Sequence, residues 1–174
     1  MPLPIIDRDT YIVSVSSFPL GIAAVSSILT INNNSPSTLR LNCARFKPVD
    51  KTGVVASTII LEGWFLSASS TGGTNQSSLI VKMDPSSANL NTSVVIVSGA
   101  DVTVSGRPVL GGGYQISSLN SNPIPMYLYR GGEEIKQVTL RPGSWFSIIV
   151  APQTILPSTA ARMSFLMEFT VDTT

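Results

Sequence analysis

The sequence predicts an all-β protein, built as a single jelly roll or two-sheet antiparallel β-sandwich. Apolar, β-branched segments recur about every 12 to 18 residues, the spacing of short strands. Runs of Ser, Asn, Gly and Pro, which favour turns, separate these segments. The chain holds 25 Ser and 15 Thr but only 12% charged residues, so the helix formers Glu and Lys are scarce. All three observations favour strands over helices.

About ten strands separated by loops of irregular length favour a jelly roll over an up-and-down barrel, whose hairpins are short throughout. No window of ten or more residues shows a convincing 3.6-residue repeat, and no repeat of fixed period indicates a solenoid or propeller. The predicted strands span 10–17, 21–31, 38–46, 54–66, 78–83, 93–104, 113–118, 124–130, 135–140, 144–151 and 162–172.

The last of these segments has the clearest strand pattern, because its residues alternate between apolar and polar. Such alternation predicts a strand with one buried and one solvated face. Leu166 alone breaks the pattern on the polar side. The apolar positions are Met163, Phe165, Met167, Phe169 and Val171.

A tight hairpin is predicted within the segment PMYLYRGGEEIKQVTL. Gly131 and Gly132 can adopt the positive φ that a two-residue turn requires. Glu133 and Glu134 lie at or just after this turn, so we expect them to be solvated.

Two segments are apolar on both faces, which is unusual for a strand with one face in water. In 144–151, Trp145 and Ile149 alternate with Phe146 and Ile148, and 54–66 has the same character. Such strands must be covered on both sides. A loop, a second sheet or another subunit can supply the second cover, and the sequence leaves all three open.

The charge balance favours self-association and argues against direct nucleic-acid binding. The 11 basic and 10 acidic residues give a net charge of +1, so copies approach without strong repulsion. Basic residues are dispersed, whereas backbone binding needs them clustered. No composition shift divides the chain, so we expect one domain over 10–174, preceded by an N-terminal arm over 1–9.

The sequence offers little for catalysis, and we expect no enzyme, metal or cofactor. The chain has no histidine, which excludes Ser-His-Asp and Cys-His nucleophiles and the usual Cys/His zinc sites. Glu62 and Glu168 are the least turn-like acids and the best candidates for a glycosidase pair. Glu168 lies on the outward parity of its strand, so a solvated position is the simpler interpretation. The glycine run of GRPVLGGGY lacks the Lys-Ser/Thr of a phosphate loop.

A family resemblance is carried by the uncharged, Pro-containing start MPLPII, the strand spacing and the doubly apolar segment LRPGSWFSIIVAP. With these features the chain resembles viral single-jelly-roll capsid proteins. More narrowly, it is similar to the small major capsid protein of tailless, icosahedral, membrane-containing phages of Thermus. The low charge departs from the ion-pair networks of thermophile proteins.

This resemblance implies a jelly roll standing over an internal viral membrane. It also implies a homo-oligomer, a dimer or larger, that joins a second capsid protein in the virion shell and touches the genome only indirectly. The family offers no catalytic residues to carry over.

Three functions stay open on the residues alone: a subunit of a shell or fibre, a sugar- or receptor-binding module, and a hydrolase. A phage decoration or head-fibre protein would share the same features. For contacts we single out the large aromatics of the doubly apolar strands, because aromatics are enriched at interface centres. These interface candidates are Trp64, Phe65, Trp145 and Phe146.

Overall fold

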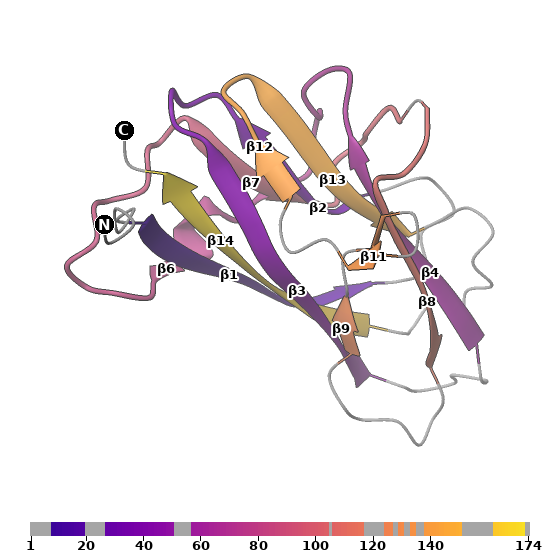
Figure 1. Ribbon diagram of the computed structural model, residues 1–174. Helices are drawn as coiled ribbons and strands as arrows, with labels where there is room; N and C mark the ends of the chain where they lie inside the picture. Colours follow the sequence, from indigo (N-terminus) through magenta and orange to yellow (C-terminus); the bar gives the residue numbers. More distant parts are fainter. Residues whose placement is uncertain are drawn as a thin grey trace.

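Two antiparallel sheets packed face to face form the computed structural model (Figure 1), which confirms the predicted all-β sandwich. In the first sheet the strands lie in the order β12-β3-β14-β1-β6, with β9 also paired to β3. In the second sheet the order is β5-β7-β2-β13-β4-β8. The structure describes residues 8–19, 27–50, 57–104, 106–116, 124–126, 129–130, 133–134, 138–150 and 162–172.

Most of the strands overlap predicted segments, but β5 was not predicted, β3 runs on to Asp50 instead of ending at residue 46, and β8 begins at Leu110 instead of residue 113. The strands are β1 (Arg8–Pro19), β2 (Ser27–Asn33), β3 (Leu39–Asp50), β4 (Ser57–Phe65), β5 (Thr74–Asn75), β6 (Ile80–Lys82), β7 (Val94–Ser98), β8 (Leu110–Ile116), β9 (Ile124–Met126), β10 (Tyr129–Arg130), β11 (Glu133–Glu134), β12 (Val138–Leu140), β13 (Ser144–Val150) and β14 (Arg162–Asp172). The predicted hairpin is confirmed, because Arg130 pairs with Glu133 and Tyr129 with Glu134.

Eight of these strands follow the jelly-roll order. The first sheet contains β1, β3, β12 and β14, and the second contains β2, β4, β8 and β13. Along the chain the path passes from one sheet to the other at nearly every step, and only β4 and β8 are successive members of one sheet. This arrangement is that of a double-sheet jelly roll.

An insertion between β4 and β8, residues 66–109, adds strands to both sheets. It holds β5, the 3-10 helix Ser77–Leu79, β6 and β7. Strand β6 pairs with β1 at the edge of the first sheet, and β7 pairs with β2 in the second. Strands β1 and β2 therefore both gain a partner from the same insertion.

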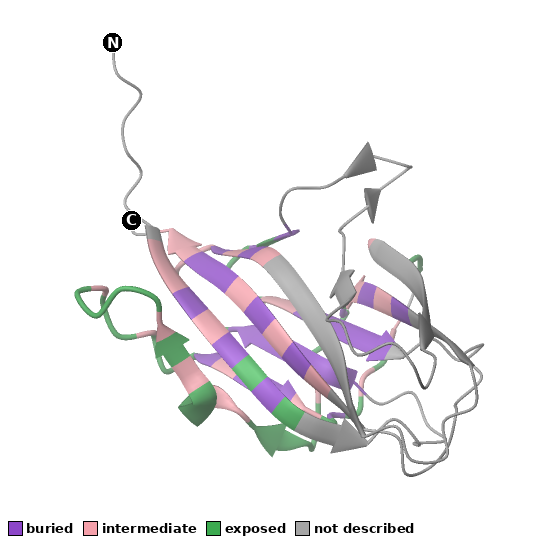
Figure 2. Ribbon diagram, turned by 90° about the horizontal axis from the view of Figure 1, so that it is seen from below, coloured by how far each residue is buried: buried purple, intermediate pink, exposed green. Residues whose placement is uncertain are grey.

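The core lies between the sheets and contains the apolar residues of one parity from each strand. Figure 2 shows buried residues alternating with more exposed ones along the strands of the first sheet. In β14, Phe165, Met167 and Phe169 are buried, which confirms their predicted inward parity. The rings of Tyr11 and Phe169 stack at a centroid distance of 5.5 Å. Leu166 is half-buried on the outer face, so it is an apolar residue on the polar side of the strand, as the sequence indicated.

Two further predicted boundaries need correction. Strand β1 begins at Arg8, so the last two residues assigned to the arm are strand, and residues 1–7 lie outside the described part of the chain. The strand predicted over 93–104 ends at Ser98, because Gly99 turns at φ +64° and Ala100 donates its N–H to the Ser27 hydroxyl. Residues 21–26 of the predicted second strand also lie outside the described residues.

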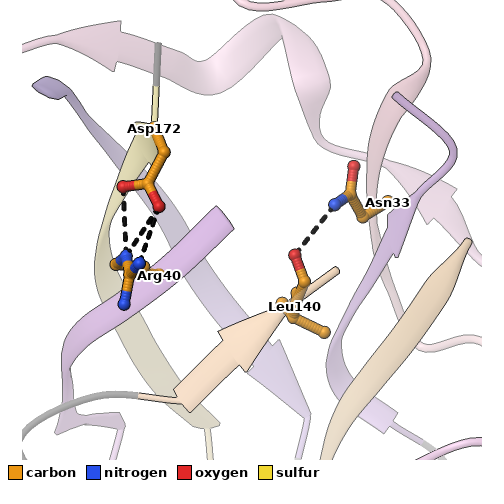
Figure 3. A network of polar contacts seen from close by, with 4 residues as sticks. All are labelled: Asn33, Arg40, Leu140 and Asp172. Carbon is orange, nitrogen blue, oxygen red and sulfur yellow. Dashed lines mark hydrogen bonds and ion pairs between the residues drawn. The ribbon is translucent and has the colours of Figure 1, made fainter. Parts of the chain in front are cut away.

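Asn33, a fully buried polar residue, joins the two sheets at one end of the sandwich (Figure 3). From the end of β2, its Nδ2 lies 2.9, 3.1 and 3.2 Å from the carbonyl oxygens of Ser37, Leu140 and Arg141. Its Oδ1 accepts hydrogen bonds from the N–H and hydroxyl of Ser35. Because Asn33 ends β2 of the second sheet and Leu140 ends β12 of the first, this buried amide bonds one sheet directly to the other.

A charged pair holds two strands of the first sheet together near the same end (Figure 3). The Arg40 guanidinium binds both oxygens of Asp172, with an Nε–Oδ1 distance of 3.0 Å and an Nη2–Oδ2 distance of 2.8 Å. The hydrogen bond to Asp172 raises the pKa of Arg40. This pair links β3 to β14 in a two-pronged geometry, the stronger form of such contacts.

We predict that Asn33→Asp destabilises the fold by roughly 2–4 kcal/mol, because a carboxylate cannot donate to the two β12-side carbonyls and is left buried against them. Urea unfolding of the purified chain measures the change. Asn34→Asp is the matched control: Asn34 is exposed and only accepts, from the Trp145 indole, so its loss should stay within about 0.5 kcal/mol. Equal losses in the two variants would contradict the sheet-joining role of Asn33.

Candidate interaction surface

The four candidate aromatics lie on neighbouring strands, but on opposite faces of the second sheet. Strands β4 and β13 pair so that Phe65 lies opposite Phe146 and Trp64 lies opposite Ser147. Phe146 belongs to the core, so Phe65 shares the inner face. Trp64 and Trp145 therefore lie on the outer face. The sequence could not show which parity faced the core.

The inner pair forms an edge-on contact at the end of the sheet. The Phe65 and Phe146 rings lie 5.6 Å apart at an interplanar angle of 69°. Phe146 is 1% exposed and is held inside the single chain, whereas Phe65 is 42% exposed. Of these two interface candidates, only Phe65 offers its ring to a neighbouring molecule.

The outer pair is half-buried, and a polar neighbour fixes each indole. Trp64 Nε1 donates to Glu62 Oε2 at 3.1 Å, and Trp145 Nε1 donates to Asn34 Oδ1 at 3.3 Å. These bonds orient both indoles while part of each ring stays accessible.

The middle of the same outer face is covered by the chain itself. The segment 66–73 runs from β4 to β5, and 99–109 runs from β7 to β8, so both must pass several strands of the second sheet. Asn32, on the outer face, donates to the Ser70 hydroxyl at 3.2 Å. Thr71 and Asp101 exchange two backbone hydrogen bonds where the two segments meet. Loop segments of the same chain thus cover part of the second apolar face of these strands, which is one of the three possibilities that the sequence left open.

Two hydroxyls lie buried on that outer face and satisfy one another. The side chains of Thr30 and Ser147 are fully buried, and their oxygens lie 3.0 Å apart. Ile149, on the same face, is 1% exposed. The outer side of β13 beyond Trp145 is therefore enclosed within one chain and leaves no exposed apolar surface for a neighbouring subunit.

A second exposed apolar site lies on the first sheet, and the sequence analysis missed it. Leu79, Val81 and Met83 are 43%, 64% and 56% exposed along β6 and its flanks. Their alternation with Ile80 and Lys82 in SLIVKMD was the signal in the sequence. Those three residues form what we call the β6 stripe.

A cavity of about 280 Å³ opens at the end of the sandwich beside the start of β1. The hydroxyl of Tyr11 donates to the Ala88 carbonyl at 2.8 Å. Burial raises the pKa of Tyr11, and the nearby Asp9 carboxylate raises it further. Besides apolar side chains, the polar groups of Asp9, Ser37, Asn89, Asn91 and Asp172 line the cavity.

The two acids considered for glycoside hydrolysis do not form a pair. Glu62 lies on the outer face of the second sheet, beside Trp64. Glu168 lies on the outer face of the first sheet, where it accepts from Asn42 Nδ2. The core separates them, whereas such a pair must flank one bond. Among the described residues, no three His, Cys, Asp or Glu side chains group as metal ligands, and no helix is long and apolar enough to cross a membrane.

We predict that Gly73→Ala destabilises the fold by about 3 kcal/mol or more. Gly73 has φ +79°, and an added Cβ would lie 2.7 Å from the Ser98 carbonyl oxygen and from Val97 Cγ1. Gly72→Ala is the control, because Gly72 has a similar φ but open space around it, so it should cost only about 1–2 kcal/mol. Thermal and urea unfolding compare the stability of the two variants. Equal losses would contradict the close approach of Gly73 to β7.

We predict that Tyr11 makes stability fall at alkaline pH. The raised pKa of Tyr11 means that its contribution is complete below the ordinary value of 10.0 and is lost as pH rises through the folded-state pKa. Tyr11→Phe should cost about 1 kcal/mol at pH 8, through the lost bond to Ala88. It should then lose less stability than the unsubstituted chain between about pH 9 and 11. Urea unfolding across this range tests the difference, and parallel pH profiles would contradict it.

No protein-family model matches the chain, and no curated protein matches its sequence.

Proposed function

We propose that this chain is a structural virion protein: a capsid subunit that self-associates and co-assembles with a second capsid protein into an icosahedral shell. Two lines support the proposal. The strand order is that of a jelly roll, a fold used by viral capsids and also by lectin domains. The sequence resembles the small major capsid proteins of membrane-containing phages.

The observation that carries the proposal is the presence of two separate exposed apolar sites on different sheets. One is Phe65 at the end of β4, and the other is the β6 stripe. A subunit that tiles a shell must contact neighbours on more than one side, and exposed apolar groups mark such contacts. Figure 1 places β4 and β6 on opposite flanks of the sandwich.

The charge balance suits this role. With a net charge of +1, identical copies pack side by side without accumulating repulsion. The same balance supplies no basic surface for the genome, so contact with nucleic acid would pass through other components. Proximity to an internal membrane is part of the proposal and follows from the resemblance.

A second candidate is a decoration or head-fibre protein, or a sugar- or receptor-binding module. The outer face of the second sheet favours it, because Trp64 and Trp145 present part of two oriented indoles beside Glu62 and Asn34. An apolar ring face next to fixed polar groups is suited to a ligand with both apolar and hydroxyl surfaces.

Multi-angle light scattering across a concentration series tests the capsid proposal, with the chain alone and with the other proteins of its source particle. We expect mass to rise with concentration and a larger co-assembly when the second capsid protein is added. A chain that stays monomeric in both settings would contradict the proposal. A glycan panel read by tryptophan fluorescence tests the alternative, with Trp64→Phe and Trp145→Phe as the variants that should lose the signal.

A further inference from the structure

We propose that β6 is the edge through which one copy of this chain pairs with a second, in an antiparallel two-fold contact centred on Val81. The inference deepens the proposed self-association by naming its surface, and it therefore rests on the proposed function. The β6 stripe, the free backbone groups of the strand and the distribution of charge carry it.

Strand β6 lies at the edge of the first sheet, where it pairs with β1 and with no other strand of the described chain. Met83 N–H donates to the Thr10 carbonyl at 2.9 Å, and this bond determines which residues of β6 direct their backbone groups toward β1. By the alternation of antiparallel ladders, the backbone groups of Val81 face β1. Those of Ile80 and Lys82 then face away from the sheet.

One of the outward-facing backbone groups of Ile80 and Lys82 is already hydrogen-bonded within the chain. The Ile80 N–H donates to the Ser77 carbonyl in the 3-10 turn. The Ile80 carbonyl and both backbone groups of Lys82 remain for a partner strand. Antiparallel pairing about Val81 aligns Lys82 N–H with the Ile80 carbonyl of the other copy, and the two-fold axis repeats the bond.

The same register matches the side chains of the β6 stripe. Val81 then lies opposite Val81 of the second copy, and Leu79 and Met83 lie on either side of this pair. All three residues are large, apolar and substantially exposed in the single chain. The Lys82 side chain points to the other face, where its Nζ donates to the Ser87 carbonyl at 2.7 Å. The Lys82 ammonium group therefore adds no charge to the β6 stripe.

Charge complementarity favours a second copy as the occupant. In a two-fold contact every residue meets the same sequence, so a charged stripe would repel itself. The β6 stripe carries no charge, and neither do Ile12 and Ser14 on the adjoining outer face of β1. Asp84, the next charge along the chain, lies three residues from the Val81 axis, so no like charges meet at the centre of the contact.

The test uses charge substitutions at Val81, which is 64% exposed and so tolerates them without loss of the fold. Val81→Glu alone, and Val81→Lys alone, should each weaken self-association by roughly tenfold or more, because two like charges would face each other in the contact. An equimolar mixture of the two variants should restore association as a mixed pair. Sedimentation velocity measures the species, and circular dichroism checks the fold.

The matched controls are Thr139→Glu and Thr139→Lys, on the exposed side of β12 at the other edge of the same sheet. They add the same charges and should leave association unchanged. Val81 variants that associate like the unsubstituted chain would overturn this inference while leaving self-association intact. Weakened variants that fail to recover on mixing would overturn the two-fold register. An unsubstituted chain that never associates, alone or with its partner proteins, would instead overturn the proposed function itself.

Discussion

The constraint on which the structure depends is that a sandwich covers only the inner faces of its two sheets. In this chain β2 is buried along its whole length, and β13 is buried on both faces from Phe146 to Ile149. The chain meets this requirement with two segments of one insertion, which cross the outer face and bond to each other at Thr71 and Asp101. One of these segments passes so close to β7 at position 73 that any side chain there would overlap the strand, which explains why this residue is a glycine.

The same insertion changes the edges of both sheets. Without β6, the twelve-residue β1 would be the last strand of the first sheet, and a long free edge invites uncontrolled pairing with other chains. The insertion covers the middle of that edge, where β6 pairs with Tyr11, Ile12 and Val13. One segment of sequence therefore covers a sheet face, pairs with part of a long strand and presents the short apolar edge that we assign to the self-contact.

Much of the fold followed from local pattern. The alternation in 162–172 predicted the inward set of β14, and the Gly-Gly pair located the hairpin between Arg130 and Glu133. What the sequence could not supply was long-range placement. The parity of Phe146 and Trp145 was visible, but only the packing of the second sheet decides which one is core. Likewise, nothing local shows that Glu62 and Glu168 lie on opposite outer faces, because that depends on the order of the strands.

The three-residue length of β6 has a further consequence for any lattice built through it. Few backbone bonds form across so short an edge, so such a contact dissociates readily. Ready dissociation is useful during growth, because a molecule that docks in the wrong place leaves before later arrivals trap it. A stable lattice would then depend on the number of neighbours that each subunit contacts at once, because each contact raises the effective concentration for the formation of the next contact. In a shell of the kind that we propose, a weak edge would thereby let misplaced subunits leave before the particle is complete.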